Sequence, residues 1–247
     1  MRTTKIEWTE STWNPTRGCT KISSGCEHCY AERIAKRLQS MGNGKYINGF
    51  ALALHPEVLN EPYSWRNPRS VFVNSMSDLF HEKIPFDYIQ KVFKVMNENR
   101  RHTFQILTKR SNVLFEFSKY LNWTKNIWMG VTVESQQFAY RIDELRRTEA
   151  FVKFLSLEPL ISSVKIASFT EIDWVIVGGE SGPGARPMLK EWVIDLKNQC
   201  QSHNVPFFFK QWGGVNKKKS GRLLEGRIWD EMPIRKHNQK HFLFQHN

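Results

Sequence analysis

Three cysteines near the N-terminus are the residues best suited to chemistry. They are Cys19, Cys26 and Cys29, in the segment WNPTRGCTKISSGCEHCY, with six and then two residues between them. Thiolates are soft, anionic ligands that suit iron–sulfur clusters or zinc, and a Cys-x-x-Cys pair brings two sulfurs onto one metal centre. A [4Fe–4S] cluster held by only three cysteines leaves one iron open to a substrate or cofactor. The spacing therefore predicts a metal centre in this segment.

The same thiols also suit zinc, and their spacing does not decide between the two metals. A structural zinc site is closed by four ligands, so it would recruit Cys200 or His28 as the fourth. These four cysteines are the only ones in 247 residues. So few in so long a chain argue against a disulfide framework and favour reduced thiols.

A second set of candidate residues follows the apolar runs of the chain. A polar or charged residue stands at or just after the end of nearly every predicted strand. In parallel α/β folds the ligand site lies at this edge, so we expect these side chains to converge on one pocket. The ordinary alternative is a set of polar loops and salt bridges at the mouth of a barrel. The residues are Asp78, Lys109, Glu134, Glu158, Glu180 and Lys210.

A glycine-rich turn, GGESGPG, covers residues 178–184. Its backbone N–H groups are able to cradle an anion, and glycine permits the close approach of a ligand. A tight connection from a strand to a helix needs glycines as well. We therefore take Gly178, Gly179 and Glu180 as candidate cofactor-binding residues.

The elements that must position these residues form a repeated βα pattern. Short β-rich runs alternate with polar turns and helix-like segments, which is typical of a parallel sheet. The runs are nearly continuous in apolar residues, as expected of strands buried on both faces. The predicted fold is an α/β protein with a partial or full parallel (βα) barrel over residues 1–213. The predicted strands are 70–76, 103–107, 128–133, 152–157, 174–177 and 206–210, and the predicted helices are 86–100, 111–121, 136–147 and 190–203.

Charge points to a polyanionic partner. The formal net charge is +12, and residues 210–247 alone hold nine basic and three acidic residues. DNA, RNA or a nucleotide is a reasonable partner for such a chain. Lys217 to Lys219 also read as a simple solvated loop. We expect residues 214–247 to form a basic C-terminal extension or a cap over the barrel, and Trp13, Tyr30, Trp212 and Trp229 are aromatic side chains able to stack on a base.

The location follows from what the sequence lacks. No run approaches the roughly 18 to 20 apolar residues of a membrane span. The start, MRTTKIEWTESTWNP, has no apolar core of the kind found in a secretory signal. We expect a cytoplasmic protein that is not embedded in a membrane.

Motifs spread from Thr12 to Gly213 add a resemblance to a known family. The chain resembles a phage-associated, radical-SAM-like family of unknown substrate, within the radical S-adenosylmethionine (SAM) superfamily and sometimes encoded beside a partner protein. In that superfamily three cysteines in the loop after the first strand hold a [4Fe–4S] cluster whose open iron binds SAM. The resemblance therefore implies a barrel of the radical SAM type, with Cys19, Cys26 and Cys29 in the loop between a first extended segment and the helix-like AERIAKRLQ. Their usual spacing is three and then two residues, whereas here it is six and then two. The matching blocks are TWNPTRGCTKISSGCEHCYAE, VFVNSMSDLF, ILTKR, GVTVE, FLSLEPL, WVIVGGESG, ARPM and PFFFKQWG.

The resemblance implies roles for the strand-end residues. Glu134 or Glu158 would accept hydrogen bonds from the SAM ribose or ammonium, and Lys109, Arg110 or Arg186 would pair with a carboxylate or phosphate. The leading hypothesis is a radical SAM enzyme that modifies or repairs a nucleic acid or nucleotide. A zinc-stabilised nucleic-acid-binding protein without catalysis is the alternative. A third hypothesis, a metal-independent barrel hydrolase, has no supporting hydrolytic motif in the chain.

Overall fold

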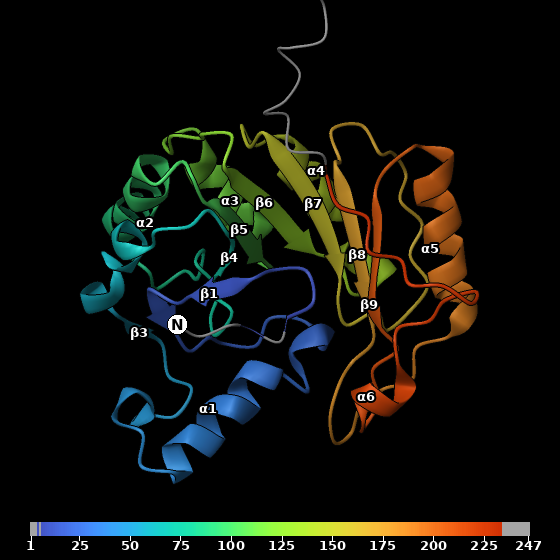
Figure 1. Ribbon diagram of the computed structural model, residues 1–247, viewed down its shortest axis with the longest axis horizontal. Coiled ribbons are helices and arrows are strands. Elements are labelled where there is room, and N and C mark those ends of the chain that lie inside the picture. Colours follow the sequence, from blue (N-terminus) through green and yellow to red (C-terminus); the bar gives the residue numbers. More distant parts are fainter. Residues whose placement is uncertain (1–3, 5, 234–247) are drawn as a thin grey trace, which may run out of the picture.

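A seven-stranded, all-parallel sheet curls into a half-barrel (Figure 1). The computed structural model describes Thr4 and residues 6–233, apart from the side chains of residues 217 and 218. The strand order is β1-β4-β5-β6-β7-β8-β9. This architecture confirms the predicted partial parallel barrel. The strands are β1 (Ser11–Trp13), β4 (Ser70–Val73), β5 (Thr103–Thr108), β6 (Ile127–Thr132), β7 (Val152–Leu157), β8 (Trp174–Gly178) and β9 (Phe207–Gln211).

Four helices cover the convex face of the sheet. Each brings apolar residues at helical spacing onto the strands, as Ile89, Val92, Phe93 and Met96 do in the first of them. The predicted helices are confirmed, with ends shifted by a few residues. The helices are α2 (Phe86–Glu98), α3 (Ser111–Ser118), α4 (Tyr140–Arg146) and α5 (Lys190–Ser202).

The two faces of the sheet carry different sets of apolar side chains. Alternate strand residues, such as Val175 and Val177, join the helices in the main core. The residues between them, such as Trp174 and Ile176, form a separate cluster on the concave face, which Trp8 covers from the N-terminal segment. Both faces of the central strands are therefore buried, which explains their nearly continuous apolar sequence.

The cysteines lie between the first strand and the first helix, as predicted. A short antiparallel pair, β2 (Thr16–Arg17) with β3 (Ala53–Leu54), flanks this loop, and α1 (Tyr30–Ser40) follows it. Residues 42–67 form the long connection to β4. The 3-10 helices among the described residues are η1 (Ser24–Cys26), η2 (Gly44–Tyr46), η3 (Pro56–Val58), η4 (Glu61–Ser64) and η5 (Gln136–Phe138).

Residues 214–233 pack onto the same body. They include α6 (Lys217–Ser220), and Leu224 and Trp229 are buried in the main core. The indole of Trp174 donates to the Glu231 carbonyl at 2.8 Å. Positions 235, 236 and 240 of the basic extension lie outside the described residues. Among the helices described, none is long and apolar enough to cross a membrane.

Candidate functional site

The cysteine loop lies across the carboxyl edge of the sheet. Gly18 forms a bridge with Ser77, which follows β4. The Gly25 amide donates to Glu134 Oε1 at 3.3 Å beyond β6, and Arg186 Nη2 donates to the Ser24 carbonyl at 2.9 Å beyond β8. One loop thus contacts the ends of strands that are widely separated in the sheet, so residues from several βα units face the same segment.

Cys19 lies against a buried arginine. Arg110 Nη1 is 3.4 Å from the Cys19 Sγ, and Arg110 Nη2 donates to the hydroxyl and the carbonyl oxygen of Thr20 at 2.9 and 3.1 Å. Burial, reinforced by the charge of Asp78, raises the pKa of the Cys19 thiol to about 11, although Arg110 opposes this shift. Arg110 therefore holds both Cys19 and the residue after it.

Cys26 has the opposite electrostatic setting. Burial opposes ionisation of its thiol, but the charge of Lys109 and hydrogen bonds from Ile22 and Ser23 outweigh it and lower the pKa. The Ser23 hydroxyl lies 3.5 Å from the sulfur. The Lys109 ammonium has no hydrogen-bond or ion-pair partner within the described chain, so its charge is available to an anionic ligand beside this thiol.

Cys29 immediately precedes α1. It is partly buried against the small cluster of Ala31, Ala35 and Met76. It is the N-cap residue of α1. All three thiols are free, and none is fully buried.

Three thiolates are suitable ligands for a soft metal, but in this structure they are not arranged as a metal site. Across the described residues, no three His, Cys, Asp or Glu side chains are grouped closely enough to hold a metal ion. The Cys19 and Cys26 thiols do interact electrostatically. All three lie within residues 19–29, so a shared metal would require this loop to rearrange.

Cys200 is excluded as a fourth ligand. Its side chain is completely buried in the main core on α5, and burial raises its pKa to about 12. It behaves as a small core residue. Of the two ligands considered for a closed zinc site, only His28 remains, and its ring lies beside Gly184 at the same edge of the sheet.

Asp78 is committed to internal hydrogen bonds. Its Oδ1 accepts from the Thr108 hydroxyl at 2.7 Å, and its Oδ2 accepts from the Lys109 amide at 3.1 Å and from Arg110 Nη1 at 3.2 Å. Arg110 also pairs with Glu82 and is only 2% exposed. Asp78 and Arg110 therefore fix the turn after β5 and position the Cys19 segment, while Lys109 extends from that turn.

Glu134 forms a buried ion pair. Its Oε2 accepts from Arg141 Nη1 at 2.8 Å, and both side chains are essentially inaccessible. A Cβ on Gly25 would lie 2.9 Å from Glu134 Oε1, so only glycine fits closely against this carboxylate. Glu134 anchors the cysteine loop to the end of β6.

Glu158 and Lys210 form a more accessible pair at the carboxyl edge of the concave face. Lys210 Nζ lies 2.9 Å from Glu158 Oε1, and Glu158 Oε2 accepts from the Ser156 hydroxyl at 3.2 Å. A Cβ on Gly178 would lie 2.7 Å from the same carboxylate. Gly178 thus makes room for this pair, and Glu158 is a strand-end carboxylate whose side chain remains partly exposed.

The rest of the glycine-rich turn is used by the protein itself. The Gly179 amide donates to the Gln211 carbonyl, and a Cβ on Gly179 would meet the Trp212 carbonyl at 2.1 Å. Glu180 accepts from Arg186 Nε at 3.0 Å and Nη2 at 2.6 Å. Burial opposes ionisation of Glu180, but Arg186 outweighs it and lowers the pKa. Gly179 and Glu180 therefore join β8, β9 and the cysteine loop.

Several contributors at this edge were not identified from the sequence. His81 Nδ1 accepts the Lys83 amide at 3.1 Å, so its Nε2 carries the proton and donates to the Thr20 hydroxyl at 3.0 Å. Burial and the nearby Arg110 lower the pKa of His81, which agrees with a neutral ring. Arg141 is likewise a helical residue with no motif around it. Of the four aromatic residues expected to stack on a base, Trp13 and Trp229 are core residues and Trp212 donates to the Leu223 carbonyl, whereas Tyr30 is 46% exposed.

Comparison with known proteins gives one match. A family model described as a protein of unknown function (DUF5131) matches residues 3–233. No curated protein and no solved structure matches the chain. The matched range contains the cysteine loop and every strand-end residue discussed above.

Proposed function

The chain belongs to the DUF5131 family, and from its site we propose an iron–sulfur enzyme of the radical SAM type that acts on a nucleic acid or nucleotide. The observation that carries the proposal is the position of the cysteine loop. Three free thiols lie on one loop across the carboxyl edge of a parallel half-barrel, where such folds place their ligands. The fold is compatible with an enzyme of this type.

The proposal gives the thiols and their neighbours distinct tasks. Cys19, Cys26 and Cys29 would ligate the cluster, and the Arg110 N–H beside Cys19 would stabilise negative charge on that sulfur. When bound, such a cluster supplies reductive cleavage of SAM, the source of a radical that abstracts hydrogen. Lys109, beside Cys26, is the cation available for the SAM carboxylate.

The carboxylates divide into anchors and a ligand-binding candidate. Asp78, Glu134 and Glu180 are each neutralised by a neighbouring arginine, so they position the loops. Glu158 is left to accept from the SAM ammonium or ribose, with Lys210 holding its orientation. The buried aromatic cluster toward the amino ends of the same strands keeps water from that part of the concave face.

Anaerobic reconstitution with iron and sulfide tests the metal. We expect a brown protein whose visible absorption bleaches on reduction. Cys19→Ser, Cys26→Ser and Cys29→Ser should each lose most of the bound iron, whereas Cys200→Ser should keep it, because Cys200 is a core residue. A colourless protein that holds one zinc per chain would overturn the proposal in favour of the zinc-stabilised binding protein.

Calorimetric titration with SAM tests the cofactor site. The reconstituted protein should bind SAM, and Lys109→Ala should weaken the binding without loss of iron. Lys94→Ala, on α2 and away from the cysteine loop, is the matched control. Equal affinities for the wild type and Lys109→Ala would remove Lys109 from the proposed site.

A further inference from the structure

A pocket of about 350 Å³ opens between α1 and the loop that follows β8. Tyr30, Arg33, Ile34 and Arg37 line it from α1, and Gly182 and Val215 line it from the opposite side. The α1 residues have i, i+3, i+4 and i+7 spacing, so they share one face of the helix. Ala31 and Ala35, on the other face, are buried against the body of the protein. The pocket therefore lies along the free face of the helix that begins directly after Cys29.

Its positive charge is not neutralised. The Arg33 guanidinium donates to the carbonyl oxygens of Ser181 and Pro183, which contribute no negative charge. Arg37 has no hydrogen-bond or ion-pair partner for its side chain in the described part of the protein. No acidic residue lines the pocket. Two cations facing one cavity favour an anionic ligand such as a phosphate.

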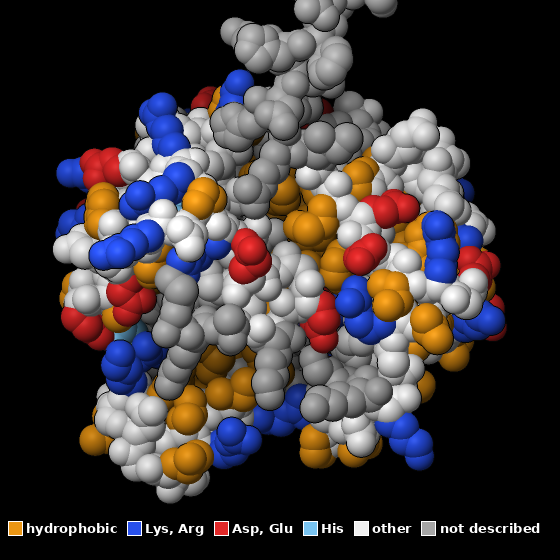
Figure 2. Space-filling model, viewed as in Figure 1, with side chains coloured by type: hydrophobic (Ala, Val, Ile, Leu, Met, Phe, Trp, Pro, Cys, Tyr) orange, Lys and Arg blue, Asp and Glu red, His pale blue; other side chains and the backbone are white. Residues whose placement is uncertain are grey.

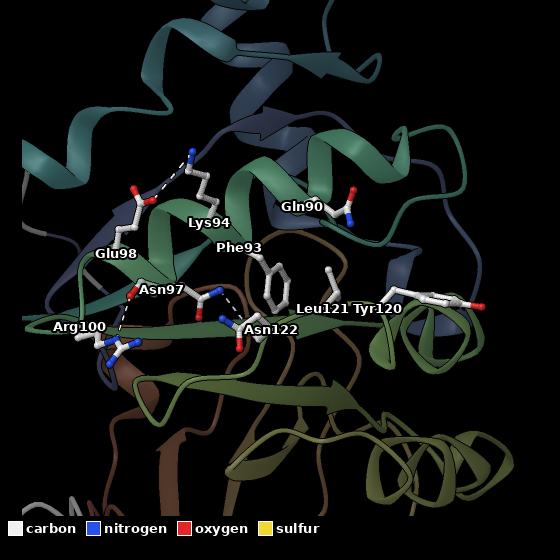
Figure 3. A pocket seen from close by; sticks show the side chains of 9 residues that line it. All are labelled: Gln90, Phe93, Lys94, Asn97, Glu98, Arg100, Tyr120, Leu121 and Asn122. Carbon is white, nitrogen blue, oxygen red and sulfur yellow. Dashed lines mark hydrogen bonds and ion pairs between the residues drawn. The ribbon is translucent and has the colours of Figure 1, made fainter.

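A second pocket among the described residues carries less net positive charge. It has a volume of about 400 Å³ and lies between α2 and the end of α3 (Figure 3). There Lys94 lies 4.0 Å from Glu98, and Asn97 donates to the Asn122 carbonyl across the pocket. Of its two cations, Lys94 is paired with Glu98, whereas Arg100 donates only to the Asn97 carbonyl. This pocket therefore keeps one uncompensated cation, against two in the pocket on α1, and it provides an internal comparison.

The remaining walls of the α1 pocket are apolar and exposed. Tyr30 is 46%, Ile34 is 40% and Val215 is 76% exposed. In Figure 2, hydrophobic and basic side chains alternate along the lower part of the molecule, where Figure 1 places α1. An aromatic ring beside arginines is the combination that binds unpaired nucleotides, because a base stacks on the ring while the backbone meets the cations. Paired bases in a duplex are stacked on one another and would not enter a pocket of this kind.

We propose that this pocket binds one unpaired nucleotide of a single-stranded nucleic acid. Its phosphate would lie on Arg33 and Arg37, and its base against Tyr30, Ile34 and Val215. The inference rests on the proposed function in taking nucleic acid as the substrate class. The Tyr30 hydroxyl donates to the Ser75 carbonyl at 2.5 Å, at the end of β4, so the bound nucleotide would lie beside the proposed metal loop.

Fluorescence anisotropy with labelled oligo-dT and oligo-U tests the site and distinguishes DNA from RNA. We expect Tyr30→Ala to weaken binding by roughly 5- to 150-fold through loss of base stacking. Arg37→Ala should weaken it too and reduce the slope of log affinity against log salt by about 0.7, the value for one phosphate contact on a single strand. Tyr30→Phe keeps the ring and should bind nearly as the wild type does. Lys94→Ala, which removes the lysine paired with Glu98 in the second pocket, should change neither value.

The outcomes separate this inference from the proposed function. If Arg37→Ala and Tyr30→Ala bind both oligonucleotides as tightly as the wild type, the pocket is not the nucleotide site. Iron content is measured on the same preparations, and Arg37→Ala should retain the cluster because it contacts no cysteine. Iron incorporation with no binding of either oligonucleotide would overturn only the inference. Binding that depends on Arg37 in a protein that takes up no iron would overturn only the proposed cluster.

Discussion

The two edges of the concave face use the same strands for different purposes. Toward the amino ends of the strands, Trp174 lies 5.7 Å from Phe154, 6.0 Å from Phe208 and 6.2 Å from Trp8 between ring centroids. Two to four residues further along these strands, at the carboxyl edge, Lys210 and Glu158 form an ion pair. A rigid aromatic base thus supports a charged edge. In barrels of this kind we expect stability to depend on the first region and ligand chemistry on the second.

The largest expected effect tests the aromatic region. Trp174→Ala should lower the free energy of unfolding by about 3–5 kcal/mol, because it removes a fully buried ring that contacts four other aromatic side chains. Urea denaturation measures the change. The folded fraction should still take up iron in reconstitution. Loss of iron from protein that remains folded would show that the two regions are not separable.

At the carboxyl edge, the buried ion pair of Glu134 with Arg141 is an exception, because we expect it to contribute to stability. Glu134→Ala should also cost about 3–5 kcal/mol, because it leaves the Arg141 guanidinium buried without its carboxylate. Glu82→Ala is the matched control, since the Glu82 side chain is half exposed and Arg110 keeps Asp78. The control should cost about 1 kcal/mol or less. If urea denaturation gave the same loss of unfolding free energy for Glu134→Ala and Glu82→Ala, burial would not determine how much these ion pairs stabilise the fold.

Adding one methyl group at Gly130 or at Gly178 compares the aromatic region with the carboxyl edge. A Cβ on Gly130 would lie 2.4 Å from the buried ring of Phe154, so Gly130→Ala should cost about 1–3 kcal/mol through overpacking. A Cβ on Gly178 meets the Glu158 carboxylate, whose side chain can move aside. Gly178→Ala should therefore change thermal stability less than Gly130→Ala does but weaken SAM binding. The reverse order of stabilities would contradict this assignment.

The smallest expected effect is a pH dependence at Glu180. Because Arg186 holds its folded-state pKa below the ordinary value of 4.5, its ionised form stabilises the fold above that pH, and this contribution is lost as the pH falls through the lowered pKa. The stability difference between the wild type and Glu180→Gln should therefore be largest above pH 4.5 and shrink under more acidic conditions. Denaturation series at several pH values measure it. A difference that grows on acidification would have the wrong sign.

Most strands and helices could be predicted, because each depends on the pattern of apolar residues within one short segment of the sequence. Continuous apolar runs such as WVIV predict strands buried on both faces, and the spacing of Ile89, Val92 and Met96 predicts a helix. The position of the cysteine loop followed from chain order alone. The short β1, which pairs with β4 across more than 50 intervening residues, has no comparable local signal.

The sequence by itself determined which residue types stand at the strand ends, since each strand is followed directly by its polar residue. Only the tertiary structure decided which of them are already neutralised. Arg110 comes from a different βα unit than Asp78. Arg141 and Arg186 follow Glu134 and Glu180 by seven and six residues, but only the folded turns bring their side chains onto these carboxylates. The same holds for Cys200, because burial in the core is a property of packing and not of the cysteine count. Charge compensation and burial both act through space, so they appear only when the chain is folded.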